Sequence, residues 1–309
     1  MSERPLCTTR REFLTGGLTF LSSAAVLPVF LGNTARVSAG PEPLPRRNND
    51  SDRILVMVQL AGGNDGLNTV IPYENGLYYK YRRRIAIAKT DVLPLEQGLG
   101  LHPAARGLKE LYDDGKLAIV QGVGYPNHSR NHFASTLIWQ TGDPRLELRG
   151  GWLGRSLGLV ARMIAADVPT RVYYVSMGGF DTHTAQMVRH RRLLAEFGNA
   201  AKSFVDTLKA DRLLDRVLVV TFSEFGRRVQ ENAGGGTDHG EAAPMFLIGS
   251  KLRPGIHEKH PSLATLHRGA LIPGCDFRRV YATVLRDWLN IKPDKVLDAG
   301  FAPLRLITK

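Results

Sequence analysis

Five apolar runs, separated by segments of helical character, constrain the fold most strongly. The first, ILVMVQL at 54–60, is nearly continuous and rich in β-branched residues, as is typical of a strand buried on both faces. Helical patterns alternate with the runs, and Asp276 is placed to cap a final helix. This alternation predicts an α/β three-layer sandwich with a largely parallel central sheet. The other runs lie at 117–123, 171–177, 216–222 and 245–250, and the helical patterns at 102–115, 151–167, 184–211 and 275–290.

The amino-terminal segment has the pattern of an export signal. Arg10 and Arg11 form a twin-arginine pair, an apolar run without charge extends to Arg36, and small residues precede a cleavage site after Ala39. The alternative is an uncleaved membrane anchor, which the glycines and the proline within the run disfavour. We therefore expect a signal peptide at 1–39, a proline-rich linker at 40–52 and a single domain at 53–309. Export by the twin-arginine translocase would make the protein periplasmic or secreted.

Charge and cysteine content narrow the partners. The formal net charge of +12 favours anionic partners, either a small-molecule or polymer substrate or a polyanion of the cell envelope. The basic residues are scattered, and the densest clusters, YRRR at 81–84 and RHRR at 189–192, are expected to be solvated helix faces. No motif of a nucleic-acid-binding module accompanies them, so no nucleic acid is expected. Because Cys7 leaves with the signal, Cys275 has no intramolecular partner, and stability depends on packing or metal.

Polar residues follow four of the predicted strands at the point where each strand ends. In a parallel α/β sheet these ends share one edge, where ligands bind. Taken singly, each residue is open to another interpretation: a turn residue, a helix cap or a member of a surface ion pair. Together, however, the carboxylates would repel one another unless a divalent cation neutralised them. Glycines just before Asp65, Asp181 and Asp238 would let the backbone turn tightly there. The residues are Asp65; Ser129 and Arg130; Asp181 and His183; Glu224, Arg227, Asp238 and His239.

The motifs at these strand ends resemble those of the alkaline phosphatase and sulfatase superfamily. The chain is more closely similar to a family of twin-arginine-exported bacterial proteins of undetermined function that is grouped with that superfamily. This resemblance covers essentially all of the chain after the leader and implies an alkaline-phosphatase-like fold. The motifs are LAGGNDGLNT (60–69), NHSRNHF (127–133), GGFDTH (178–183), SEFGR (223–227) and GTDHG (236–240).

The resemblance also implies roles for individual residues. It implies one or two divalent metal ions: zinc, manganese, magnesium or calcium. Asp65, Glu224 and Ser129 would form an oxygen-rich site suited to magnesium, calcium or manganese, and Asp181, His183 and His239 a site suited to zinc or manganese. Asp238 would join His239 or orient its ring. Ser129 would be the nucleophile, Arg130 or Arg227 would hold the substrate oxygens, and His128 or His132 would protonate the leaving group. One departure is Glu224-Phe225, where the superfamily commonly has Asp-His.

Three hypotheses on function follow. The first is an exported metal-dependent hydrolase of phosphate or sulfate esters. The second is a non-catalytic metalloprotein of the same fold that binds an envelope polyanion such as a sulfated glycan. The substitution by Phe225 favours this second hypothesis. The third is a structural partner protein for export, whose acidic edge holds no metal.

Overall fold

The computed structural model describes residues 53–126, 128–132, 135–136, 139, 153–168, 170–297 and 300–308, and the backbone of 18–20. The rest of the predicted signal peptide and all of the predicted linker lie outside these residues. Within the described chain no helix is long and apolar enough to cross a bilayer.

An eight-stranded sheet forms the centre of the described chain. Strand β2 (Ile54–Leu60) lies between β7 (Val172–Met177) and β8 (Val217–Phe222) and is parallel to both. Strand β9 (Ala243–Ile248) is antiparallel to both of its neighbours, β8 and β6 (Leu117–Gly124), so β6 runs in the same direction as β8. The predicted largely parallel sheet is therefore confirmed, with β9 reversed. The edges are β1 (Leu18–Phe20) beside β7, and β10 (Gly255–His257) and β13 (Cys275–Asp276) beside β6.

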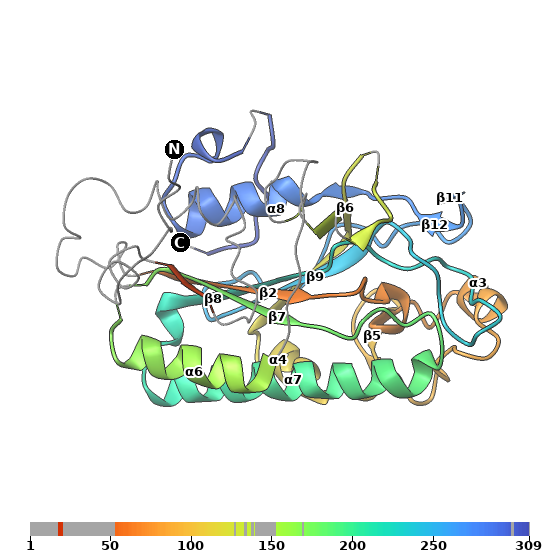
Figure 1. Ribbon diagram of the computed structural model, residues 1–309, viewed down its shortest axis with the longest axis horizontal. Coiled ribbons are helices and arrows are strands. Elements are labelled where there is room, and N and C mark those ends of the chain that lie inside the picture. The colour runs from red at the N-terminus through yellow and green to blue at the C-terminus, as the bar shows by residue number, and fades with distance from the viewer. Residues whose placement is uncertain are drawn as a thin grey trace, which may run out of the picture.

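Helices cover both faces of the sheet, as Figure 1 shows. Helices α4 (Arg106–Asp113), α6 (Leu153–Ala165) and α7 (Gln186–Ala210) lie on one face. Helix α8 (Phe277–Thr283), continued by the π-helix η3 (Val284–Trp288), lies on the other. Alternate residues of β2 serve the two layers: Val56 and Val58 belong to the core under α4, α6 and α7, and Leu55 and Met57 to the core under α8. All seven residues of β2 are buried, as its apolar sequence predicts.

Several local predictions are confirmed by the structure. Asp276 caps α8 by accepting a hydrogen bond from the backbone N–H of Arg278. Strand β9 begins at Ala243, two residues earlier than the apolar run suggested, and so includes Pro244. The register of β9 with β6 shifts between Val120 and Val123, next to the partner of Ala243. Such an irregularity accommodates a proline, which has no N–H to donate to a neighbouring strand.

Smaller elements gather at the end of the molecule where α3 lies in Figure 1. A three-stranded sheet and a hairpin extend the domain there, and they pack around a third apolar core that includes Leu67, Tyr78 and Val229. These elements are α3 (Gly76–Tyr81), β3 (Val70–Ile71), β4 (Leu93–Pro94), β5 (Gly100–Leu101), β11 (Leu266–His267) and β12 (Ala270–Leu271). The remaining short helices are η1 (Gly66–Asn68), η2 (Leu214–Arg216) and η4 (Pro293–Lys295).

Candidate metal centre

Four strands that point the same way deliver polar loops to one edge of the sheet. Because β2, β6, β7 and β8 are mutually parallel, the segments after their last residues emerge on the same side. From β7 the chain continues to Asp181 and His183, from β8 to Glu224, Arg227 and His239, and from β6 to His132. Residues far apart in sequence therefore meet in one cluster.

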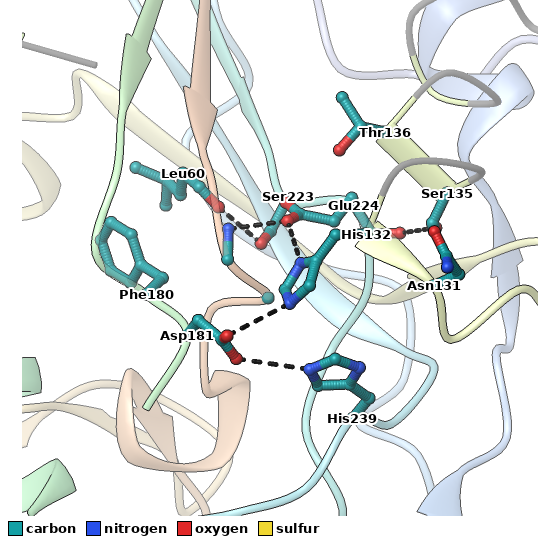
Figure 2. A network of polar contacts seen from close by, with 12 residues as sticks. Leu60, Asn131, His132, Ser135, Thr136, Phe180, Asp181, Ser223, Glu224 and His239 are labelled. Atoms are coloured by element: carbon teal, nitrogen blue, oxygen red, sulfur yellow. Dashed lines mark hydrogen bonds and ion pairs between the residues drawn. The ribbon is translucent and has the colours of Figure 1, made fainter. Parts of the chain in front are cut away.

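His132, Asp181 and His239 form the centre of this cluster (Figure 2). Each offers one ligand atom, and these atoms lie within 4.8 Å of one another. Nε2 of His132 is 3.4 Å from Oδ2 of Asp181, and Nε2 of His239 is 3.3 Å from Oδ1. Ligand atoms bound tetrahedrally at about 2.0–2.1 Å from one ion lie about 3.3 Å apart. The two distances from histidine nitrogen to Asp181 oxygen therefore match the spacing of ligands around one small divalent cation.

In both imidazole rings a partner at Nδ1 directs Nε2 toward Asp181. Nδ1 of His132 is 2.9 Å from Oε1 of Glu224, and Nδ1 of His239 is 2.7 Å from the carbonyl of Arg130. A ring that donates from Nδ1 presents the lone pair of Nε2, and in both rings Nε2 faces Asp181. Nε2 of His132 is buried without a hydrogen-bond partner in the described part of the chain. The donor set therefore fits zinc or manganese.

The surroundings favour the metal-binding protonation states of Asp181 and His239, but they favour a proton on His132. Burial would raise the pKa of Asp181, but the hydrogen bond and the positive charge of Arg227 outweigh it and lower the pKa to about 2. Burial lowers the pKa of His239, which favours the neutral ring that binds a metal. For His132, burial is opposed and outweighed by Glu224 and Asp181, which raise the pKa above its usual value. A proton on His132 would thus compete with a cation.

His183 supplies a fourth candidate ligand beside the other three. Its Nε2 is 2.9 Å from Nε2 of His239 and 3.1 Å from Oδ1 of Asp181. Its Nδ1 is 3.4 Å from Asp238, which also accepts a hydrogen bond from Asn232 at 3.1 Å. The structure therefore brings the predicted group of Asp181, His183 and His239 together. Asp238 contacts the ring of His183, however, and not that of His239 as expected.

Arg227 lies behind the cluster and contacts the backbone. Its guanidinium is fully buried and donates to the carbonyls of Gly62, Gly63, Phe180 and Thr237, and to Oδ1 of Asp181 at 2.7 Å. These contacts use its donors and shield it from solvent. It thus fixes the loops and Asp181, which is a different role from the expected contact with substrate.

The predicted oxygen-rich site of Asp65, Glu224 and Ser129 is not assembled in the described residues. Asp65 is fully buried, and its Oδ2 pairs with Arg82 at 2.5 Å and accepts a hydrogen bond from Gln186. Burial would raise the pKa of Asp65, but the charge and hydrogen bond of Arg82 lower it overall. Arg82 therefore supplies a positive counter-charge at Oδ2 of this carboxylate, while Oδ1 is buried without a hydrogen-bond partner among the described residues. Glu224 accepts from the N–H of Gly62 at 2.7 Å and orients His132.

The loop that carries the predicted nucleophile lies beside the cluster without delivering the hydroxyl to it. Oγ of Ser129 accepts only from the N–H of Asn131, at 3.3 Å, among the contacts of the described residues. The side chain of Arg130 pairs with Glu241 at 2.8 Å. His128 stacks on Tyr125 with ring centroids 3.9 Å apart, and its Nδ1 is 2.6 Å from the carbonyl of Tyr125. Among the described side chains of this motif, only that of His132 reaches the cluster.

Two residues that stabilise the site were missed at the sequence level. Arg82 was expected on a solvated helix face within YRRR, and His190 within RHRR, yet both are buried. Gln186 links the site to this interior, since it contacts Asp65, Thr182 and Thr237. Arg83, Arg189, Arg191 and Arg192 are exposed as expected. Nothing in the YRRR sequence distinguishes Arg82 from the two arginines that follow it. Only the position of α3 in the folded chain directs Arg82 inward.

Comparison with known proteins gives a family match over part of the chain. A family model described as "Protein of unknown function (DUF1501)" matches residues 153–285, which include the motifs of Asp181, Glu224 and His239. Among curated proteins, no significant match to the sequence is found.

Three solved structures are similar to this chain over most of its length. The C-terminal periplasmic domain of EcEptC from Escherichia coli has 12% identity and a TM-score of 0.41, covering 87% of this chain and 93% of that one. Murine ectonucleotide pyrophosphatase/phosphodiesterase 5, in complex with AMP, has 9% identity and a TM-score of 0.38, covering 81% and 97%. The lipoteichoic acid synthase LtaP from Listeria monocytogenes has 9% identity and a TM-score of 0.34, covering 89% and 81%. At this level of sequence identity and structural similarity, no substrate or metal can be assigned to this chain from these structures.

Proposed function

We propose that the protein is an exported metal-dependent hydrolase of phosphate or sulfate esters. The observation that carries this proposal is the convergence of Nε2 of His132, a carboxylate of Asp181 and Nε2 of His239 at the carboxyl edge of the sheet. The side chains are 32%, 49% and 21% exposed, so a bound ion would keep an open side toward solvent. Catalytic metal sites keep such an open position, whereas structural ones are closed.

Each residue has a proposed part in this activity. His132, Asp181 and His239 would hold one divalent ion, and the ring of His183 lies beside them. The ion, when bound, would stabilise negative charge on the oxygens of the ester. Glu224 and the carbonyl of Arg130 orient the two histidine rings, and Arg227 fixes Asp181. Ser129 remains the proposed nucleophile, since it lies three residues before His132 on the same loop.

A non-catalytic metalloprotein that binds a polyanion is the second candidate. Two observations favour it. Phe225 is fully buried and packs against the rings of His132 and His239, with centroids 4.8 and 4.5 Å apart, and so fills one side of the cluster with an inert ring. The hydroxyl of Ser129 has no contact with the cluster in the described residues.

The first test combines metal content with turnover. The purified protein should contain about one zinc or manganese per chain and hydrolyse members of a panel of phosphate monoesters, phosphodiesters and sulfate esters. His239→Gln should lower metal affinity by about a hundredfold or more and abolish turnover, because it removes a direct ligand whose supporting contacts alone are worth about 10–100-fold. His257→Gln is the matched control, since His257 lies in β10 and contacts Arg253 instead. If the protein binds metal but hydrolyses none of these esters, the result would favour the non-catalytic metalloprotein that binds a polyanion.

A further variant tests the nucleophile. Ser129→Ala should abolish turnover while metal content and the unfolding transition stay unchanged. Retained turnover would rule out Ser129 as the nucleophile and leave solvent water in that role.

A further inference from the structure

A hollow of about 430 Å³ lies beside the metal centre and is bordered by cationic side chains. Lys80, Arg83 and Arg84 are all exposed, and they come from the last turn of α3 and the residues after it. Lys80 and Arg83 have no ionic or hydrogen-bond partner in the described chain, so their charges are open to a ligand. The lining is Lys80, Tyr81, Arg83, Arg84, Gln230, Glu231, Asn232 and Ala233.

The single carboxylate of the hollow is already neutralised. Oε1 of Glu231 pairs with Nε of Arg84 at 3.0 Å, and Oε2 accepts from the backbone N–H groups of Arg84 and Ile85 at 3.0 and 3.1 Å. Although burial raises the pKa of Glu231, these contacts lower it overall, which keeps the carboxylate ionised and paired. Arg84 is also anchored by the carbonyls of Asn232 and Ala233. The charge that remains for a ligand is therefore positive and comes from Lys80 and Arg83.

Asn232 forms a wall shared by the hollow and the metal centre. Its Nδ2 donates to Oδ1 of Asp238 at 3.1 Å and to the carbonyl of His183 at 3.0 Å, while the residue itself lines the hollow. Asp238 in turn lies 3.4 Å from the ring of His183. Asn232 and Asp238 thus connect the lining of the hollow to the ring of His183.

We propose that this hollow binds a second tetrahedral oxyanion of the ligand while the metal centre engages the first. The inference rests on the proposed function and narrows it: the substrate is an ester within a molecule that carries several phosphate or sulfate groups, and not an isolated monoester. Guanidinium and ammonium groups bind such oxyanions through charge-assisted hydrogen bonds. Two linked anionic groups would gain affinity because the second binds as an intramolecular event.

The test uses ligands that cannot be hydrolysed, so it does not depend on turnover. Calorimetry on the zinc-supplemented protein compares 1,6-hexylenebisphosphonate with methylphosphonate, and 1,6-hexanedisulfonate with methanesulfonate. The ligand with two anionic groups in at least one pair should bind about tenfold tighter or more, and the pair that shows this identifies phosphate or sulfate as the natural group. The double variant Lys80→Gln/Arg83→Gln should abolish that advantage, because each charged hydrogen bond contributes substantially.

A matched double variant controls for loss of general charge. Lys295→Gln/Arg305→Gln removes one lysine and one arginine that are exposed in the segment after α8, and neither residue lines the hollow. This control should still bind the ligand with two anionic groups more tightly than the ligand with one. Both double variants should keep the zinc content and the affinity for methylphosphonate. An advantage that survives in Lys80→Gln/Arg83→Gln, or none in the wild type, would overturn the inference. Neither result bears on whether esters are hydrolysed.

Discussion

At the scale of single residues, Asp65 was expected to bind a metal ion, and in the structure its carboxylate forms an ion pair with Arg82. Both side chains are fully buried and 2.5 Å apart. Arg82 also contacts Asn68 and the carbonyls of Val229 and Arg228, so its position is fixed by two segments, 65–68 and 228–229. A buried carboxylate needs a cation close by, and here the protein supplies its own. The pair ties the loop after β2 to the region around α3.

Removing this carboxylate should destabilise the fold without affecting metal content. Asp65→Asn leaves Arg82 buried without its counter-charge, which costs about 3–5 kcal/mol, measured by urea unfolding. The zinc or manganese content per folded chain should stay unchanged. Asp113→Asn is the control: Asp113 pairs with Lys109 four residues away on the surface of α4, and such pairs contribute about 0.3–0.5 kcal/mol. Lost metal binding with full stability would show instead that Asp65 is a ligand.

The same variant has a predictable pH dependence. The pKa of Asp65 is lower in the folded chain than its usual 3.8, so the stability that the ionised carboxylate contributes is complete above that value. As the pH falls below 3.8, the unfolded chain takes up a proton first and the contribution is lost. The difference in unfolding free energy between wild type and Asp65→Asn should therefore be constant from pH 7 to about 5 and narrow below about 4.

At the scale of elements, glycines allow the loops of the site to touch one another. A Cβ on Gly62 would lie 2.3 Å from the backbone nitrogen of Asp181, and one on Gly236 would lie 2.3 Å from the carbonyl oxygen of Thr182. In both places backbone packs on backbone, so no side chain can move aside. The expected tight turns are present, since Gly62, Gly179 and Gly235 have positive φ, and at Gly62 and Gly236 the loops also come into close contact.

An added methyl group should loosen the metal centre from a distance. Gly236→Ala would push the 232–240 loop away from Thr182 and His183, and the strain should lower stability by about 1–3 kcal/mol. Zinc affinity, measured by competition with a chelator, should fall by about tenfold because His183 and His239 would separate. Gly158→Ala in α6 meets open space and should stabilise the protein by about 0.5–1 kcal/mol. Equal zinc affinity in the two variants would refute this account.

At the scale of the whole molecule, the parallel strands determine where chemistry is possible. Strands β2, β7 and β8 pair side by side in register, so their last residues lie at one level of the sheet. Both faces are covered by helices, which leaves this edge as the place where polar loops meet solvent (Figure 1). His132 arrives there from β6, on the far side of β9. The metal centre therefore depends on the order of the strands in the sheet, and not on any one motif.

We also predict that the whole domain is exported through its twin-arginine signal. Arg10→Lys/Arg11→Lys should retain most of the protein in the cytoplasm, because it removes the guanidinium pair of the proposed twin-arginine signal. Arg36→Lys, in the same leader, should leave export unchanged. Mass spectrometry of the exported protein should find an amino terminus near Gly40. Export of the paired variant at the wild-type level would refute the assignment of the signal.

The sequence by itself determined the layers of the fold, because runs such as 54–60 are apolar enough to require burial on both faces, and Asp276 marks a helix start through local hydrogen bonding. It also located Asp181, His183 and His239 at strand ends that meet. Tertiary structure alone decided that Arg82 turns inward to Asp65, that His132 reaches the cluster and Ser129 does not, and that Arg227 is buried. The physical reason is range: burial patterns and caps act over a few residues, whereas the direction of a side chain at the end of a loop is set by contacts with segments fifty or more residues away, as between His183 and His239.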